Sequence, residues 1–146
     1  MSSNEYKATA RTNYFAVKDI TAFEAEIAEI CKLSLGFEGY HLKTKKIDGI
    51  DTYAILFYTD DGGRVPMQYW TSDNEHRLVD WSDLFSRHLQ DDWVAIIMEV
   101  GSINHDWLQG FAEAYNNKME TKSVLLSHIF TQAENLGKYI TTTEDN

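Results

Sequence analysis

The chain has 146 residues, which is the usual length of one domain and too short for two ordinary ones. Its residues are 43% hydrophobic and 25% charged, an ordinary composition for a soluble globular protein that excludes a disordered, collagen-like or fibrous chain. The formal net charge of -10 is opposite to what nucleic-acid phosphates or an anionic membrane attract, so we expect no direct nucleic-acid binding and no membrane binding.

The N-terminal part predicts a strand followed by a helix. Residues 11–18 (RTNYFAVK) carry side chains that suit a pleated surface and predict the strand. Thr21 and Glu24 have the spacing of a capping box, which predicts where the helix begins. Gly36 predicts where the helix ends. The predicted buried side of this helix consists of Phe23, Ile27, Ile30 and Cys31.

The middle of the chain predicts three strands joined by hairpin turns. The strands cover residues 41–47, 52–59 and 64–71, and the turn signals are Asp48-Gly49 and residues 60–63. Pro66 cannot donate a hydrogen bond to a ladder, so it predicts that the third of these strands lies at an edge of the sheet. Residues 71–79 are polar and favour no single element.

A second helix is predicted over residues 80–90, with Asp80 as its N-cap. Its predicted buried face consists of Trp81, Leu84, Phe85 and His88. Residues 93–100 (WVAIIMEV) are apolar on both faces of a strand, which is typical of a central position in a sheet. We expect further strands at 107–115 and 123–126, then a last helix from Ser127 to Gly137. The last helix is predicted to bury Ile129, Phe130, Ala133 and Leu136.

The predicted order is therefore β-α-β-β-β-α-β-β-β-α. Hairpin-length connections between most strands favour an α+β domain, in which about three helices pack on an antiparallel-rich mixed sheet. We expect one domain over residues 1–146, with flexible ends at 1–9 and 141–146 because both ends are polar.

No motif of standard enzyme chemistry is present. The chain has no Gly-rich phosphate loop, no Gly-x-Ser-x-Gly elbow and no His-Glu-x-x-His helix. The single cysteine, Cys31, excludes an intramolecular disulfide and a multi-cysteine zinc site, and its helix face predicts a packed core thiol. We therefore expect no catalytic residue, no metal and no cofactor. The single cysteine is compatible with a reducing cytoplasm, and together with an N-terminus that has no apolar signal core it leads us to expect a cytoplasmic location.

Three residues are candidates for a binding site. Glu99 lies in the most apolar strand, where a carboxylate faces a core layer or a cleft. Its alternative role is structural: an end-of-strand residue that reaches solvent or pairs with Arg11, Arg64 or Arg87. Trp70 and Trp107, on an edge strand and at a strand start, are placed to line a groove or a dimer seam. Their alternative role is packing in the core or at its rim.

Three stretches together carry a resemblance: residues 11–18, residues 94–101 (VAIIMEVG) and residues 123–130 (SVLLSHIF). With them the chain resembles a family of small acidic bacterial proteins carried on phages, plasmids and other mobile elements, whose activity is not characterised. The resemblance covers most of the domain, and residues 36–79 depart from it. It implies a shared fold and an accessory-gene origin, and it transfers no functional residue.

The leading hypothesis is a non-enzymatic interaction or binding protein of mobile-element origin. Its partner would be another protein or a second copy of the chain. A sharper form is an acidic inhibitor of a nucleic-acid-binding partner, since acidic residues far outnumber basic ones between Asp73 and Glu113. The alternative is a small enzyme or ligand-binding domain with a cleft near Glu99, Trp70 and Trp107. A third possibility is a homodimer built through the edge that contains Pro66.

Overall fold

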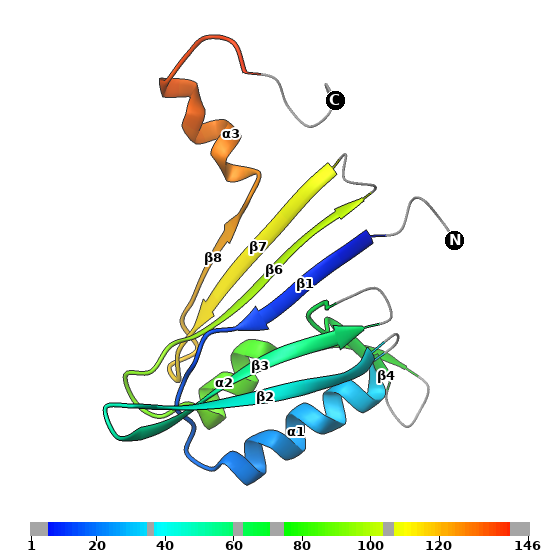
Figure 1. The fold of residues 1–146 in the computed structure, drawn as a ribbon, viewed down its shortest axis with the longest axis vertical. Coiled ribbons are helices and arrows are strands. Elements are labelled where there is room, and N and C mark those ends of the chain that lie inside the picture. Colours follow the sequence, from blue (N-terminus) through cyan, green and yellow to red (C-terminus); the bar gives the residue numbers. More distant parts are fainter. Residues whose placement is uncertain (1–5, 35–36, 60–62, 71–74, 104–106, 141–146) are drawn as a thin grey trace.

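A computed structural model describes residues 6–34, 37–59, 63–70, 75–103 and 107–140 (Figure 1). The elements in chain order are β1 (Tyr6–Thr12), α1 (Ile20–Leu33), β2 (Phe37–Ile47), β3 (Ile50–Thr59), β4 (Gln68–Trp70), β5 (His76–Leu78), α2 (Trp81–His88), β6 (Ala95–Ile103), β7 (Trp107–Tyr115), β8 (Thr121–Leu125), α3 (His128–Gln132) and the 3-10 turn η1 (Ala133–Asn135). The α+β class and the predicted order are confirmed, and the structure adds the short strand β5 within the segment to which the sequence assigned no element.

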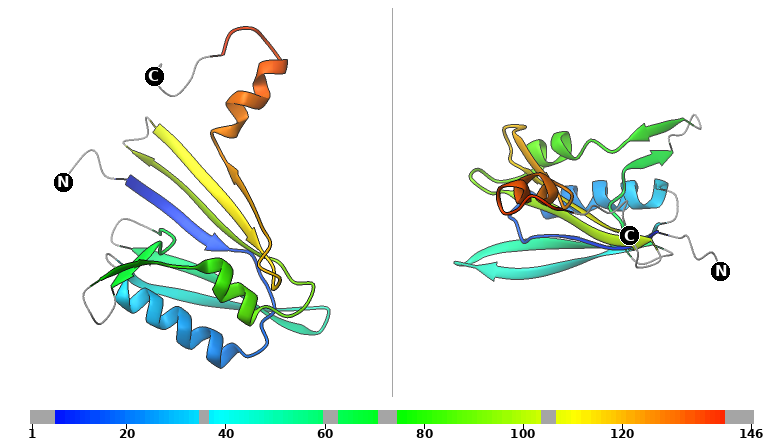
Figure 2. Two further views of the ribbon diagram at one scale, coloured as in Figure 1. Left: turned by 180° about the vertical axis from the view of Figure 1, so that it is seen from behind. Right: turned by 90° about the horizontal axis from the view of Figure 1, so that it is seen from above.

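Six strands form one antiparallel sheet in the order β2-β3-β1-β6-β7-β8, and β4 pairs with β5 in a separate two-stranded sheet. The apolar strand β6 lies inside the large sheet, which confirms its predicted central position. Helices α1 and α2 and the β4–β5 pair lie over one face of the sheet, and no described element lies over the other (Figure 2). We call these the inner face and the outer face.

The hydrophobic core fills the space between the inner face and the two helices. Phe15 is fully buried, and its ring meets the rings of Phe23 on α1 and Phe85 on α2 edge-on, with centroids 5.6 and 5.4 Å apart. The predicted buried faces of both helices are confirmed, except that Ile30 is only partly buried. Aromatic pairs in this geometry add to the free energy gained by burial, so Phe15 links the two helices to the sheet.

The first strand differs from its prediction. It begins at Tyr6, within the segment expected to be frayed, and ends at Thr12 rather than Lys18. Beyond that point only Phe15 and Val17 make isolated bridges. The physical cause is Thr12, whose hydroxyl accepts the Ile55 amide at 2.9 Å and so replaces a main-chain acceptor at the end of the ladder. Residues 1–5 and 141–146 of the predicted flexible ends lie outside the described ranges.

The N-cap of α1 is Asp19, and the predicted capping box at Thr21 is wrong. The Asp19 carboxylate accepts hydrogen bonds from the amides of Thr21 and Ala22 at 3.0 and 3.2 Å. The N-cap is therefore two residues earlier in the chain than the predicted capping box placed it, and the helix begins at Ile20. Helix α1 ends at Leu33. Gly36, the predicted helix stop, lies outside the described residues.

The predicted pairing of residues 64–71 with the second strand of the meander is wrong. Pro66 is fully buried and lies outside the six-stranded sheet. Two backbone donors at the start of this segment are used elsewhere: Gly63, just before it, donates to the Ala8 carbonyl at 2.7 Å, and Val65 donates to the Glu99 carboxylate at 2.7 Å. The segment therefore crosses the six-stranded sheet instead of extending it. The homodimer expected at a Pro66 edge stays a prediction.

Other predicted elements are confirmed. The Asp48-Gly49 turn joins β2 and β3 with φ values of 51° and 81°, a left-handed pair that suits a two-residue hairpin. Asp80 caps α2 through the Asp83 amide at 3.0 Å. Strand β7 has its predicted bounds, and β8 begins two residues before its predicted start and ends one residue before its predicted end. Within the described residues, no helix has the length and apolar character needed to cross a membrane.

The last helix begins where it was predicted but is shorter than predicted, since α3 ends at Gln132 and continues as the 3-10 turn η1, and it is not buried. Neither α3 nor η1 contains a buried residue, and Ile129 and Leu136 are 54% and 90% exposed. The chain runs from β8 into α3 away from the helix layer, beyond the body of the domain (Figure 1). Its apolar side chains therefore lack the core that their spacing predicted.

The capping difference gives a test. We expect Asp19→Ala to lower the free energy of unfolding by about 1 kcal/mol, because two first-turn amides lose their acceptor. Urea denaturation followed by circular dichroism measures the change. Thr21→Ala is the matched control and should change stability by a few tenths of a kcal/mol, within the range of about ±0.5 kcal/mol that is usual for surface substitutions. A larger loss for Thr21→Ala than for Asp19→Ala would contradict the assigned cap.

Candidate functional site

Glu99 is a buried residue of the inner face. On β6 it lies between its two cross-strand partners, Ala10 of β1 and Phe111 of β7, and the residue is 8% exposed. One carboxylate oxygen accepts the Val65 amide at 2.7 Å. A charged acceptor makes this hydrogen bond stronger than a neutral one would. The arrangement fastens the segment around Pro66 to the sheet, which is a positioning role.

The two candidate tryptophans belong to different sheets. Trp70 is in β4 and pairs with His76, whereas Trp107 begins β7 and pairs with Ile103. The side chains of both tryptophans lie outside the described part of the chain. The β7 partner of Glu99 is Phe111, and Trp107 precedes it on the same strand by two periods of the pleat. The backbone therefore assigns Glu99 and Trp107 to one sheet and Trp70 to the other.

A cavity of about 420 Å³ lies on the inner face, lined in part by Val65 and Phe111, and Glu99 itself does not line it. The sequence did not point to most of the residues of this cavity. Trp81, Phe111 and Tyr115 supply aromatic walls, and Asp80 and Glu113 supply carboxylates. The Tyr115 hydroxyl donates to Glu113, and burial together with this carboxylate raises the pKa of Tyr115. The signal that could have revealed the site is the alternation of Phe111, Glu113 and Tyr115 along β7, which places all three on one face.

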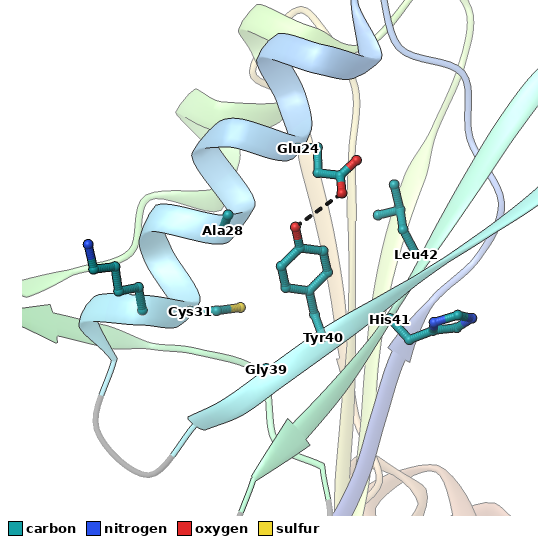
Figure 3. A pocket seen from close by; sticks show the side chains of 8 residues that line it. Glu24, Ala28, Cys31, Gly39, Tyr40, His41 and Leu42 are labelled. Atoms are coloured by element: carbon teal, nitrogen blue, oxygen red, sulfur yellow. Dashed lines mark hydrogen bonds between the residues drawn. The ribbon is translucent and has the colours of Figure 1, made fainter.

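An open groove of about 600 Å³ separates α1 from the edge strand β2 (Figure 3). Tyr40 and Leu42 point from β2 toward the helix, and the Tyr40 hydroxyl donates to Glu24 at 3.4 Å. Cys31 lies at the floor of the groove and is 5% exposed. Burial raises the pKa of the Cys31 thiol to about 11, so the thiol stays protonated at neutral pH and is a poor nucleophile.

A cluster of charges joins the two helices. Glu26 of α1 accepts from both terminal nitrogens of Arg87 and lies 2.9 Å from the His88 ring nitrogen. The Arg87 guanidinium is the main reason that the pKa of Glu26 falls to about 2, and the His88 hydrogen bond adds to this effect. Arg87 also donates to Asp83 at 3.0 Å. The cluster therefore holds α1 and α2 together and leaves no free acid or base there.

The outer face carries an apolar surface on β6, β7 and β8. The strand register aligns His41, Leu56, Arg11, Met98, Ala112 and Val124 in one row across the six strands. The row is polar at β2 and β1 and apolar from β6 onward. We name the apolar part the outer-face patch, and it consists of Ile96, Met98, Val100, Leu108, Gly110, Ala112, Ala114 and Val124.

Several side chains of the outer-face patch are open to solvent. Val100 and Leu108 are 61% and 60% exposed, and Val124 is 50% exposed. Their strand neighbours on this face are small, because Val100 lies opposite Gly110 and Met98 lies opposite Ala112. A contiguous apolar area of this kind on a soluble domain marks an interaction surface more often than isolated exposed residues do.

No protein-family model, curated protein or solved structure shows a significant match to this chain. The resemblance to mobile-element proteins therefore stays a prediction from the sequence. Among the described residues, no group of three or more His, Cys, Asp or Glu side chains is arranged to hold a metal ion.

The helix-joining cluster predicts a pH dependence. Because the pKa of Glu26 is lowered from 4.5 to about 2, Glu26 contributes stability above pH 4.5 that is lost as the pH falls through 2. We expect Glu26→Gln to cost less than about 1 kcal/mol at pH 7, since the ion pair is partly solvated. Thermal melts from pH 7 to pH 2 measure the difference from the wild type, which should shrink below pH 4.5.

Asp83→Asn is the control for this experiment. It removes the second carboxylate partner of Arg87 and leaves Glu26 in place. The cost should be about 0.3–0.5 kcal/mol, the usual size of an exposed pair of this spacing. A Glu26→Gln difference that stayed constant from pH 7 to pH 2 would contradict the assigned pKa.

Proposed function

We propose that this chain is a non-enzymatic protein-binding protein and that the outer-face patch is its binding surface. The observation that carries the proposal is the exposure of a contiguous apolar area on the face of the sheet that no described element covers. Burial of apolar surface is the main driving force of most protein association, and about 25 cal/mol is gained for each Å² removed from water. The most solvent-exposed large side chains of the patch, Val100 and Leu108, supply that surface.

The rest of the structure is consistent with this proposal. The Cys31 thiol is protonated, and the carboxylate of Glu26 is committed to Arg87 and His88. Glu99 fastens the segment around Pro66. These groups have structural partners that explain their positions. A cytoplasmic location and a mobile-element origin belong to the same proposal, the first supported by the reduced Cys31 and the second by the resemblance.

The acidic-inhibitor form of this function would use the opposite side of the molecule. Acidic side chains gather on the helix layer, at Asp19, Glu24, Glu26, Glu29, Asp80 and Asp83. Such a surface competes with nucleic-acid phosphates for a basic partner. Inhibition of a basic nuclease should then weaken steeply with added salt and be lost in Glu24→Lys with Glu29→Lys. Glu134→Lys, a charge change outside the helix layer, is the control. Equal inhibition by the double variant and by this control would contradict the acidic-inhibitor hypothesis.

The small-ligand alternative rests on the inner-face cavity lined by Phe111, Glu113 and Tyr115. Its volume of about 420 Å³ is within the range of ligand pockets, and aromatic walls with two carboxylates suit a ligand that is apolar and cationic. A thermal-shift screen of aromatic amines tests it. We expect a binder to raise the melting temperature of the wild type but not of Glu113→Gln. An equal rise in both proteins would place the ligand elsewhere.

The main proposal predicts a site-specific contact. A photo-reactive benzophenone side chain placed at Val100 should form a discrete protein adduct in the source cells, because this position is exposed within the outer-face patch. Adding Leu108→Asp should abolish the adduct, since a charge in the patch must be desolvated on binding. Electrophoresis of the irradiated protein measures both results.

The control position is Leu78 of β5, which is apolar and 73% exposed but lies on the inner side. No discrete adduct is expected from Leu78. The proposal fails if Val100 and Leu78 give the same adducts, or if Leu108→Asp leaves the Val100 adduct unchanged.

A further inference from the structure

We propose that the partner of the outer-face patch is a second copy of this chain, which docks the C-terminal arm of one subunit on the patch of the other. This inference rests on the proposed function, because it names the occupant of the same surface. The C-terminal arm is the segment from Leu126 to Ile140, and it contains α3 and η1.

The C-terminal arm carries apolar side chains that its own domain does not cover. Leu136 and Tyr139 are each 90% exposed, Ile129 is 54% exposed and Leu126 is 49% exposed. The arm leaves the body at the end of β8 and extends away from α1 and α2 (Figure 1). One chain therefore presents two apolar surfaces without cover, the outer-face patch and the C-terminal arm.

The length of α3 is a second, independent argument. The helix has five residues and continues into a three-residue 3-10 turn. Isolated helices shorter than about 12–15 residues are marginal in water, and this one has no side-chain hydrogen bond at its N-cap. A short exposed helix needs a surface against which to pack. The outer-face patch of a second copy supplies such a surface.

Charge explains why two acidic chains can meet in this way. The acidic side chains of α1 and α2 lie on the inner side, whereas Lys7, Arg11 and Lys122 lie in the outer-face rows that border the patch. The arm itself carries one acidic and one basic residue, Glu134 and Lys138. Neither docking surface is negative, so the net charge of -10 is directed away from the contact.

Exchange of arms is symmetric. In a two-fold dimer each subunit gives one arm and receives one, so the same pair of surfaces is buried twice. A standard interface buries about 800 Å² on each partner, and both symmetric arm–patch contacts count toward that area.

The test uses full-length protein and light scattering after gel filtration. We expect the wild type to have twice the mass of one chain. Val100→Lys with Val124→Lys should give a monomer, and so should Leu136→Asp with Tyr139→Ser. All four positions are at least half exposed, so the fold should persist, as circular dichroism would confirm. Leu78→Asp, at a position 73% exposed outside both surfaces, should remain dimeric.

Mixing the two monomeric variants gives the decisive result. In the mixture the intact arm of the patch variant can dock on the intact patch of the arm variant, so one of the two contacts is restored. A complex of twice the chain mass should appear only in the mixture. Direct patch-to-patch pairing would give no such rescue.

The outcomes separate this inference from the proposed function. A monomeric wild type, a dimeric arm variant or a mixture without rescue overturns arm exchange. If the wild type is monomeric while Val100 still forms a Leu108-dependent adduct with a different protein, the protein-binding function stands and its partner is another chain. If the Val100 adduct is absent as well, both fail.

Discussion

The hydrophobic core has helices on only one side of the sheet. A sheet has two faces, and a stable domain buries an apolar face against another layer. Here α1 and α2 complete that layer over the inner face, with Phe15, Phe23 and Phe85 at its centre. The outer face receives no layer from the described chain, yet β6 to β8 keep apolar residues there. This one-sided construction explains both the well-filled core and the exposed apolar residues of the outer face.

The segment between β3 and α2 is held by side-chain contacts rather than by a ladder. The Glu99 carboxylate accepts a hydrogen bond from the Val65 amide, and the Trp81 indole donates one to the Pro66 carbonyl at 3.0 Å. These two hydrogen bonds join the sheet, the proline segment and α2. The same segment forms one wall of the cavity beside β7. Glu99 therefore shapes the cavity through Val65, although its own carboxylate is committed to a backbone amide.

Elements with a clear period could be predicted from the sequence, whereas those fixed by distant contacts could not. The faces of α1 and α2 and the central strand β6 follow from spacing alone. The route of residues 64–71 depends on Glu99, which is distant in sequence, so local β-propensity misassigned it. The apolar residues of α3 were predicted to be buried because periodicity identifies a face but not what covers it. For the same reason, alternation along β6 and β7 could not distinguish the covered face from the outer-face patch.

The position of β1 has a consequence for synthesis. It precedes the other described strands in the chain, yet it lies between β3 and β6, and its register joins Arg11 to Met98. One side of β1 can pair only after the chain between Arg11 and Met98 has been translated. At about 5–20 residues per second, that delay is roughly 4–20 s. During this interval the nascent protein has an unfinished sheet, and chaperones that recognise extended apolar segments have time to bind it.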